Sequence, residues 1–264
     1  MNRIDKKFIQ LKRNKKKAFI SFITAGDPNL KATHDLVLAF EKAGVDIIEL
    51  GVPFSDPMAD GPTIQASSQR SLDKGTTLVK VFDLVKSLRK QTDIPIALMM
   101  YYNPIFHMGE KEFVARAISS GVDGVIVPDL PPEEAGSFIK LCRKSNISTV
   151  FFLAPTTTKE RMKKIIQASS GFVYYISLTG VTGARKSAPT QYLSQAKIAK
   201  KLTSKPVCIG FGISTPEQVR EMSKFADGVI VGSAIVKEIE KNRGSKTLVS
   251  NVARFVGQLT KVMA

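Results

Sequence analysis

Cysteine and histidine are scarce in this sequence of 264 residues, which restricts the kinds of site that it can contain. The two cysteines, Cys142 and Cys208, lie far apart and outside any CxxC motif, so neither a disulfide framework nor a thiolate metal site is indicated. The two histidines, His34 and His107, have no partner at metal-ligand spacing. We therefore expect a protein of the reducing cytoplasm that has no metal site.

Long hydrophobic runs are also absent. No stretch approaches the ~20 uninterrupted apolar residues of a membrane span. The basic N-terminus is not followed by the apolar segment that a secretory signal requires. We expect a soluble protein that is neither exported nor bound to a membrane. Hydrophobic residues nevertheless make up 43% of the chain, which is enough for a sizeable core.

Acidic residues are few compared with basic ones, and the formal net charge is +16 at pH 7. The first 17 residues contribute about +7 of this charge, since they hold eight Lys or Arg and one acid, Asp5. Ile4, Phe8 and Leu11 recur there at helical spacing, which predicts a basic N-terminal helical arm with one apolar side on the body of the protein. We favour a solvated basic face over nucleic-acid contact, because only Phe8 interleaves with the basic residues. A mitochondrial presequence is the other alternative, but this arm is Lys-rich and has no Ser.

Short apolar runs alternate with longer amphipathic segments along the chain. The runs are continuous in the way expected of strands buried on both faces. They occupy residues 19–24, 47–50, 96–100, 124–127, 149–153, 173–177, 207–210 and 228–231. Helix start signals agree with this alternation, with a capping-box pattern at Thr157–Glu160 and an N-cap before proline at Thr215–Pro216.

Eight strand-then-helix units without a linker between them predict an α/β fold, a (β/α)8 TIM barrel that forms one domain over residues 1–264. A doubly wound parallel sheet is the alternative topology. About 25 residues separate the second strand from the next expected helix near Thr76, whereas such connections usually have two to six residues. We expect this long loop to be functional.

The stretch IELGVPFSDPMADGPTI (48–64) places a carboxylate, Glu49, near the end of a buried strand and two more, Asp56 and Asp60, in a Gly/Pro-rich loop. Active sites of such barrels lie at the C-terminal ends of the strands. Burial would raise the pKa of Glu49 and suit it to proton transfer, although an ion pair inside the barrel is an alternative. For both aspartates the alternative is a turn contact with the backbone, which the Asp–Pro pair favours for Asp56.

Glycine-rich loops follow the last three strands: SLTGVTGA (177–184), GFGIS (210–214) and VGSAIV (231–236). Glycine lets backbone N–H groups approach a ligand, and a helix that starts at Gly232–Ser233 would direct its positive end at an anion. These loops predict a phosphate site, with tight turns as the alternative. Tyr174, in the sixth strand, is more typical of a core aromatic when only its position in the pattern is considered.

The stretch IELGVPFSDPMADGPTIQ, together with GVTGAR, GFGIS and VGSAIV, resembles the tryptophan synthase alpha chain family in order and spacing over essentially the whole barrel. The resemblance implies a lyase that cleaves indole-3-glycerol phosphate into indole and glyceraldehyde 3-phosphate, a retro-aldol step without cofactor or metal in this chain. It implies that Glu49 is the acid/base and that Asp60 stabilises positive charge on the indole. It also places Tyr174 beside the reacting centre, which reverses the preference for a core role.

The same resemblance assigns further residues by position. It implies phosphate binding by Gly183, Gly212, Gly232 and Ser233, and an indole pocket formed by Phe22, Ile64, Tyr101, Ile126, Thr182 and Phe211. It implies a closing lid at 179–190, whose Thr182 contacts Asp60. The implied partner is a beta chain that holds pyridoxal phosphate, in an α2β2 heterotetramer, and the residues facing it are Pro53, Asp56, Asn103 and Pro104.

Two other functions stay open on the sequence. Another barrel enzyme acting on an indole or sugar phosphate, such as an isomerase or synthase, would keep the glycine loops but would not need Glu49 and Asp60 together. A basic barrel that binds nucleic acid or acts as a scaffold is favoured only by the charge of +16.

Overall fold

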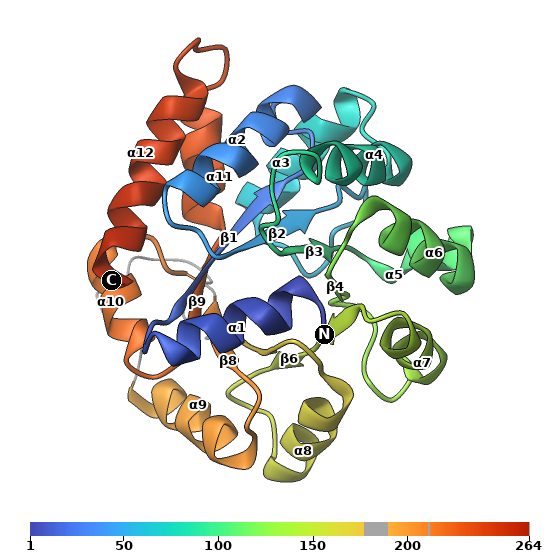
Figure 1. Ribbon diagram of the computed structural model, residues 1–264, viewed down its shortest axis with the longest axis vertical. Helices are drawn as coiled ribbons and strands as arrows, with labels where there is room; N and C mark the ends of the chain where they lie inside the picture. The colour runs from blue at the N-terminus through green and yellow to red at the C-terminus, as the bar shows by residue number, and fades with distance from the viewer. Residues whose placement is uncertain (177–189, 211, 264) are drawn as a thin grey trace.

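The computed structural model describes residues 1–176, 190–210 and 212–263, with the backbone alone at 190–194. In these residues nine parallel strands form a barrel with helices around it (Figure 1). The strands are β1 (Ala18–Thr24), β2 (Ile47–Gly51), β3 (Ile96–Met99), β4 (Gly124–Ile126), β5 (Ser148–Val150), β6 (Phe152–Leu153), β7 (Val173–Ile176), β8 (Val207–Gly210) and β9 (Gly228–Val231). Their order in the sheet is β5-β4-β3-β2-β1-β9-β8-β7-β6.

The fifth expected strand is divided into β5 and β6, and this division closes the barrel. β5 pairs with β4, whereas β6 pairs with β7. Between them, the carbonyl of Phe151 accepts a hydrogen bond of 3.1 Å from the amide of Tyr174. One continuous run of chain therefore joins the two ends of the sheet. This confirms the predicted (β/α)8 barrel and excludes the doubly wound alternative.

The helices follow the strands around the outside of the barrel (Figure 1). They are α1 (Arg3–Arg13), α2 (Leu30–Lys42), α3 (Pro62–Asp73), α4 (Leu78–Leu88), α5 (Tyr102–Met108), α6 (Glu110–Ser120), α7 (Gly136–Lys144), α8 (Lys159–Ala168), α9 (Thr190–Leu202), α10 (Pro216–Ser223), α11 (Ser233–Lys241) and α12 (Leu248–Thr260), with a short 3-10 helix at Lys261–Met263. None of these helices has the length and apolar character needed to cross a bilayer.

The connection after β2 differs from the long loop that we expected. The helix α3 occupies much of it, so only residues 52–61 remain irregular before α3, and Thr77 caps α4. Besides Ile64, the buried residues of α3 are Ser67, Ser68 and Ser71. The sequence pattern missed this helix because hydroxyl side chains, rather than aliphatic ones, make up most of its buried face.

One of the two expected helix starts is displaced by a residue. The N-cap of α8 is Thr158, whose hydroxyl accepts from the amide of Arg161, whereas the hydroxyl of Thr157 accepts from the amide of Ala154. Placing the cap at Thr157 was therefore wrong, because the turn before the helix uses that hydroxyl. At α10 the prediction is confirmed, since Thr215 and Gln218 form a reciprocal capping box.

Alternate residues of the strands point into the barrel. Interior residues such as Ile20, Ile47 and Ala97 form one apolar cluster, while their chain neighbours such as Ile48 pack beneath the helices. Glu49 lies two residues after Ile47 in β2, so its side chain continues this inward-facing row toward the C-terminal end of the barrel. The fold therefore places one carboxylate inside the barrel.

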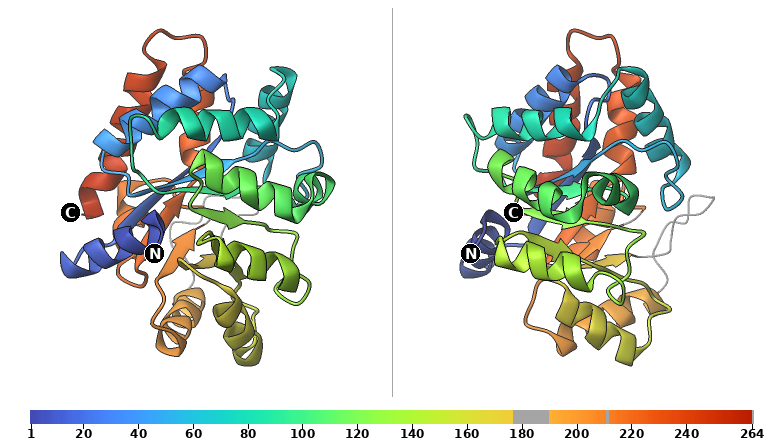
Figure 2. Two further views of the ribbon diagram at one scale, coloured as in Figure 1. Left: turned by 45° about the vertical axis from the view of Figure 1, so that its right-hand side comes forward. Right: turned by 90° about the vertical axis from the view of Figure 1, so that its right-hand side faces the viewer.

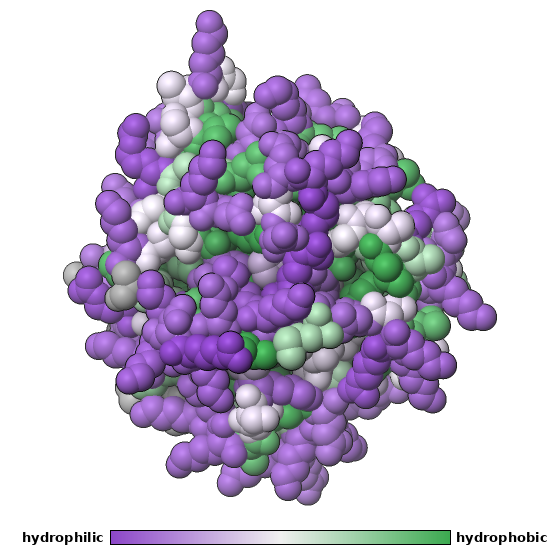
Figure 3. Space-filling view, viewed as in Figure 1, coloured by the Kyte–Doolittle hydropathy of each residue, from purple (hydrophilic) through white to green (hydrophobic). Residues whose placement is uncertain are grey.

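The basic segment at the N-terminus lies across one end of the barrel. Its helix, α1, buries Ile4, Phe8 and Leu11 against the interior cluster, as their spacing predicts. Figures 1 and 2 show α1 at the N-terminal end of the strands, opposite the expected site. Hydrophilic residues predominate on that face (Figure 3).

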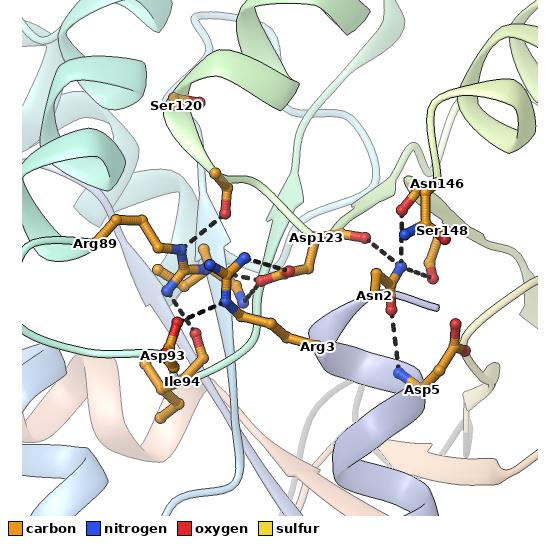
Figure 4. Close-up of polar contacts among 12 residues, drawn as sticks. Asn2, Arg3, Asp5, Arg89, Asp93, Ile94, Ser120, Asp123, Asn146 and Ser148 are labelled. Carbon is orange, nitrogen blue, oxygen red and sulfur yellow. Dashed lines mark hydrogen bonds and ion pairs between the residues drawn. The ribbon is translucent and has the colours of Figure 1, made fainter.

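Polar contacts also hold α1 in place. The buried carboxylate of Asp123 accepts from Arg3 at 3.2 Å and from Arg89 at 2.8 Å. The side-chain amide of Asn2 donates to the carbonyl of Asp123 at 2.9 Å and to the hydroxyl of Ser148 at 2.7 Å (Figure 4). Charged hydrogen bonds to a buried carboxylate are stronger than neutral ones, so α1 is an integral cover for this end of the barrel.

Candidate active site

A cavity of about 530 Å³ opens at the C-terminal ends of the strands, and residues from widely separated parts of the chain line it. Active sites of parallel barrels lie at this end. Of the residues that the sequence predicts, this cavity brings together Phe22, Glu49, Asp60, Ile64, Tyr174, Gly212, Gly232 and Ser233.

Glu49 is the most deeply buried acid of the cavity, with only 1% of its surface exposed. In β2 it pairs with Phe22 of β1 on one side and with Ala97 of β3 on the other. Its Oε2 atom has no hydrogen-bond partner among the described residues, and no described basic side chain forms an ion pair with it. Burial raises the pKa of Glu49 to about 8, and the neighbouring charge of Asp60 contributes to this increase. Glu49 is therefore mostly protonated at neutral pH.

Asp60 lies in the loop before α3 and has a specific hydrogen-bond donor. The hydroxyl of Tyr101 donates to its Oδ2 atom at 3.1 Å, and the same hydroxyl accepts from the amide of Ala59 at 2.9 Å. Phe54 stacks on the ring of Tyr101 at a centroid distance of 5.2 Å. Burial raises the pKa of Asp60 to about 6, although the hydrogen bond from Tyr101 opposes this increase. Asp60 is thus largely ionised at pH 7, whereas Glu49 is not.

Tyr174 both packs in the barrel interior and lines the cavity. Its ring belongs to the interior cluster, and 7% of its surface is exposed. A Cβ atom added at Gly210 would lie 2.5 Å from the Tyr174 hydroxyl oxygen, so glycine is required there for the ring to take this position. Burial, followed by the charge of Glu49, raises the pKa of Tyr174. Its hydroxyl therefore keeps its proton and can serve as a hydrogen-bond donor.

The far end of the cavity is suited to an anion. Gly232 is the N-cap of α11, and the first-turn amides of an α-helix have no acceptor within the helix. The helix dipole adds a partial positive charge at the same place. Gly212 lines the same end and has a φ of 74°, which side-chain-bearing residues rarely adopt. Gly212, Gly232 and Ser233, with the N-terminus of α11, thus line the same cavity.

The remaining residues expected in the indole pocket, and Gly183 of the expected phosphate site, do not line this cavity or lie outside the described residues. Tyr101 is buried, with its hydroxyl on Asp60, and Ile126 is fully buried in the interior cluster. Gly183, Thr182 and Phe211 lie outside the described residues, as does the expected lid at 179–190 except for its last residue.

The residues expected to face a partner lie on two neighbouring connections, after β2 and after β3. Asp56 and Asn103 are exposed, Pro104 in α5 is half-buried, and Pro53 is buried. The Oδ2 atom of Asp56 accepts from the hydroxyl of Ser55 at 2.5 Å. These connections therefore present polar groups at the same end of the barrel as the cavity.

Sequence reasoning missed several cavity residues, of which Met99, Ile230 and Lys237 are the most informative. The alternation of strand residues could have placed Met99 and Ile230 inside the barrel. Lys237 lies four residues after Ser233, on the same face of α11, and this spacing was the available signal. Within the described part of the chain, no group of three or more His, Cys, Asp or Glu residues is arranged to hold a metal ion.

The fold and the site together define a (β/α)8-barrel enzyme whose cavity is lined by two carboxyl groups of different acidity and by the N-terminus of a helix. Comparison with known proteins identifies the family. A family model described as the tryptophan synthase alpha chain matches residues 8–264. The chain belongs to the tryptophan synthase alpha chain family.

Relatives and solved structures agree with this assignment. The tryptophan synthase alpha chain of Geotalea daltonii is 52% identical over 259 residues, which cover 98% of each chain. That of Thermoanaerobacter sp. is 48% identical and covers 100% of both chains. The crystal structure of tryptophan synthase subunit alpha from Legionella pneumophila has a TM-score of 0.92 at 37% identity, covering 100% of this chain and 98% of that one. A chain of the Pyrococcus furiosus tryptophan synthase α2β2 complex has a TM-score of 0.87 at 42% identity, covering 93% of this chain and 99% of that one.

Proposed function

We propose that this chain is a lyase that cleaves indole-3-glycerol phosphate into indole and glyceraldehyde 3-phosphate, with Glu49, Asp60 and Tyr174 as its catalytic residues. One observation carries this proposal. Glu49 is a buried carboxyl group with a pKa of about 8, and it shares a cavity with Asp60, whose pKa is about 6. Two carboxyl groups with separated pKa values can take different roles at the same pH.

The reaction needs one proton added and one removed. Protonated Glu49 donates its proton to C3 of the indole ring, which leaves positive charge on the indole nitrogen. The ionised carboxylate of Asp60 stabilises that charge in the transition state more than in the ground state. The carbon–carbon bond then breaks, and its electrons restore the aromatic ring. The hydroxyl group on the cleaved carbon becomes the aldehyde and gives its proton to Glu49, which returns to its starting form.

The two ends of the cavity suit the two ends of this substrate. Phe22 and Ile64 line the apolar part, where we place the indole, with Thr182 and Phe211 as the family resemblance implies. Tyr101 and Ile126, which the resemblance also implies, do not line the cavity, and Tyr101 would act through its hydrogen bond to Asp60. Backbone groups of Gly212, Gly232 and Ser233, with Gly183, would hold the phosphate. Tyr174, whose hydroxyl keeps its proton, would donate a hydrogen bond beside the reacting centre.

We further propose a beta-chain partner in an α2β2 heterotetramer, to which the indole passes for L-tryptophan synthesis. The Pyrococcus furiosus relative comes from such a complex. In this chain the contact would lie at the connections that carry Pro53, Asp56, Asn103 and Pro104. Pyridoxal phosphate would belong to the partner, and the chain would act as one domain in the cytoplasm.

Indole release from indole-3-glycerol phosphate tests the proposal, measured with and without a tryptophan synthase beta chain. We expect release by this chain alone and faster release with the beta chain. No release under either condition would refute the proposed reaction. Turnover of another indole or sugar phosphate instead would favour the isomerase or synthase alternative.

The hydrogen bond from Tyr101 to Asp60 should affect how the cleavage rate depends on pH. Replacing Tyr101 with phenylalanine removes a donor that favours the ionised form of Asp60, so the pKa of Asp60 should rise. We expect cleavage at pH 6 to fall about threefold, because losing the ~1 kcal/mol of one hydrogen bond lowers the ionised fraction of Asp60 from about one half to about one sixth, and the acidic limb of the pH–rate profile to move to higher pH. Tyr102→Phe is the matched control, because the Tyr102 hydroxyl donates to Glu110 instead. An acidic limb that stays in place in Tyr101→Phe would contradict the prediction.

A further inference from the structure

Lys237 lines the cavity but has no role in the reaction proposed above. Of the described residues that line the cavity, it alone carries a positive charge. It lies one turn into α11, four residues after Ser233. Side chains in an α-helix tilt toward its N-terminus, so that of Lys237 is directed back over the first turn of α11, where Ser233 also lines the cavity.

The acidic residues that could neutralise Lys237 on its own helix are engaged elsewhere. Glu240, three residues further on, accepts a hydrogen bond of 2.9 Å from Arg70 of α3. Arg70 is itself held in place by two hydrogen bonds of 2.9 and 2.7 Å to the buried carboxylate of Asp27. The packing of α3 against α11 therefore removes Glu240 as a partner for Lys237.

The other candidate acid, Glu238, is also engaged. One of its carboxylate oxygens accepts from the side-chain amide of Asn242 at 2.9 Å, and the other lies 3.9 Å from the ammonium of Lys241. In the described part of the chain, Lys237 forms no ion pair. Its charge is thus available to a ligand in the cavity.

The charge distribution of the cavity explains why a cation is needed there. Its reacting end holds Glu49 and Asp60, and an ionised carboxylate repels a phosphate group. Backbone amides and a helix dipole supply only partial charges. A full positive charge on α11 would attract the phosphate and fix the position of that group in the cavity.

We propose that Lys237 binds the phosphate group of the substrate and thereby orients the ester in the cavity. This inference rests on the proposed function, because it takes the substrate to be a phosphate ester. Lys237 is a binding and positioning residue, and it takes no part in proton transfer. Because the phosphate does not change during the reaction, its interaction with Lys237 should be equal in the ground and transition states.

The experiment compares Lys237→Met with Lys241→Met, a matched control one turn further along α11. Binding of glycerol 3-phosphate and of indole is measured by calorimetry, and KM and kcat are measured with indole-3-glycerol phosphate. For Lys237→Met we expect about tenfold weaker binding of glycerol 3-phosphate, about tenfold higher KM and unchanged kcat. Indole binding should not change, and Lys241→Met should match the unmodified chain.

Two further measurements separate a charge effect from a packing effect. Lys237→Arg keeps the charge and should bind glycerol 3-phosphate within about threefold of the unmodified chain. Added salt should weaken that binding more in the unmodified chain than in Lys237→Met. Binding of glycerol 3-phosphate by Lys237→Met that equals that of Lys241→Met would overturn the inference.

The outcomes also distinguish this inference from the proposed function. If the chain binds glycerol 3-phosphate through Lys237 but does not cleave indole-3-glycerol phosphate, the inference holds and the proposed reaction fails. If the chain cleaves the substrate and Lys237→Met has the normal KM, only the inference fails. If the unmodified chain neither binds glycerol 3-phosphate nor cleaves indole-3-glycerol phosphate, both fail.

Discussion

Replacing Glu49 with glutamine should lower the rate of indole-3-glycerol phosphate cleavage by about 10²- to 10⁴-fold, the usual contribution of a general acid/base. The amide keeps the shape of the side chain but can neither donate a proton to C3 nor take one from the hydroxyl group on the cleaved carbon. Because the lost interaction belongs to the transition state, kcat should fall much more than KM rises. Steady-state indole release measures this effect.

The control for this variant is Glu134→Gln, which changes an exposed glutamate in the same way. Its kcat should equal that of the unmodified chain. A Glu49→Gln protein that is folded and cleaves the substrate within about threefold of the normal rate would show that Glu49 is not the acid/base.

The same substitution should make the protein more stable at alkaline pH. The pKa of Glu49 rises from its ordinary value of 4.5 to about 8 in the folded protein, a change worth roughly 5 kcal/mol. A raised pKa means that the folded state holds a proton which the unfolded state releases. The stability that this proton supplies is complete below pH 4.5, decreases as pH rises through this window, and is lost above pH 8. Glutamine cannot ionise and avoids this loss.

Urea unfolding at pH 5, 7 and 9 measures this difference. The stability gained by Glu49→Gln over the unmodified chain should increase with pH and level off above pH 8. The buried amide still needs hydrogen-bond partners, which reduces the gain by about 1–3 kcal/mol. A stability difference that is the same at all three pH values would mean that Glu49 is not buried in the way described.

Replacing Asp60 with asparagine should lower kcat by about 10²- to 10³-fold, a loss typical when a preorganised electrostatic group is removed. The positive charge that Asp60 offsets develops on the indole only as C3 is protonated, so KM should change little. The pKa of Glu49 should fall in this variant, because the neighbouring negative charge is one of the two causes that raise it.

The control for this variant is Asp73→Asn, at the exposed C-terminal end of α3, which should have normal kcat. The pH dependence of stability provides a second readout. In Asp60→Asn the pH range over which Glu49 loses its stabilising proton should end at a lower pH than in the unmodified chain. An increase in KM with normal kcat would instead make Asp60 a substrate-binding residue without a role in the chemical step.

The sequence by itself determined the features that depend on local period and residue type. Continuous apolar runs alternating with amphipathic segments predicted eight strand-then-helix units and favoured the (β/α)8 barrel, because a strand buried on both faces and a helix with one apolar face have different periods. The position of Glu49 followed from the same pattern, since an acid near the end of such a strand lies at the mouth of the barrel. Glycines after the last strands predicted a phosphate site, and two of them, Gly212 and Gly232, line the cavity.

The tertiary structure alone decided what depends on contacts between distant segments. The fifth run divides into β5 and β6 because it must pair with different neighbours in order to close the barrel. The hydroxyl of Tyr101, after β3, donates a hydrogen bond to Asp60, which lies after β2. Arg70 donates a hydrogen bond to Glu240, which leaves the charge of Lys237 available. These contacts join residues that are 41 and 170 positions apart, so no periodic pattern in the sequence could have predicted them. Both depend on how the helices and loops pack around the barrel, which is why the environment of each charge could be read only from the fold.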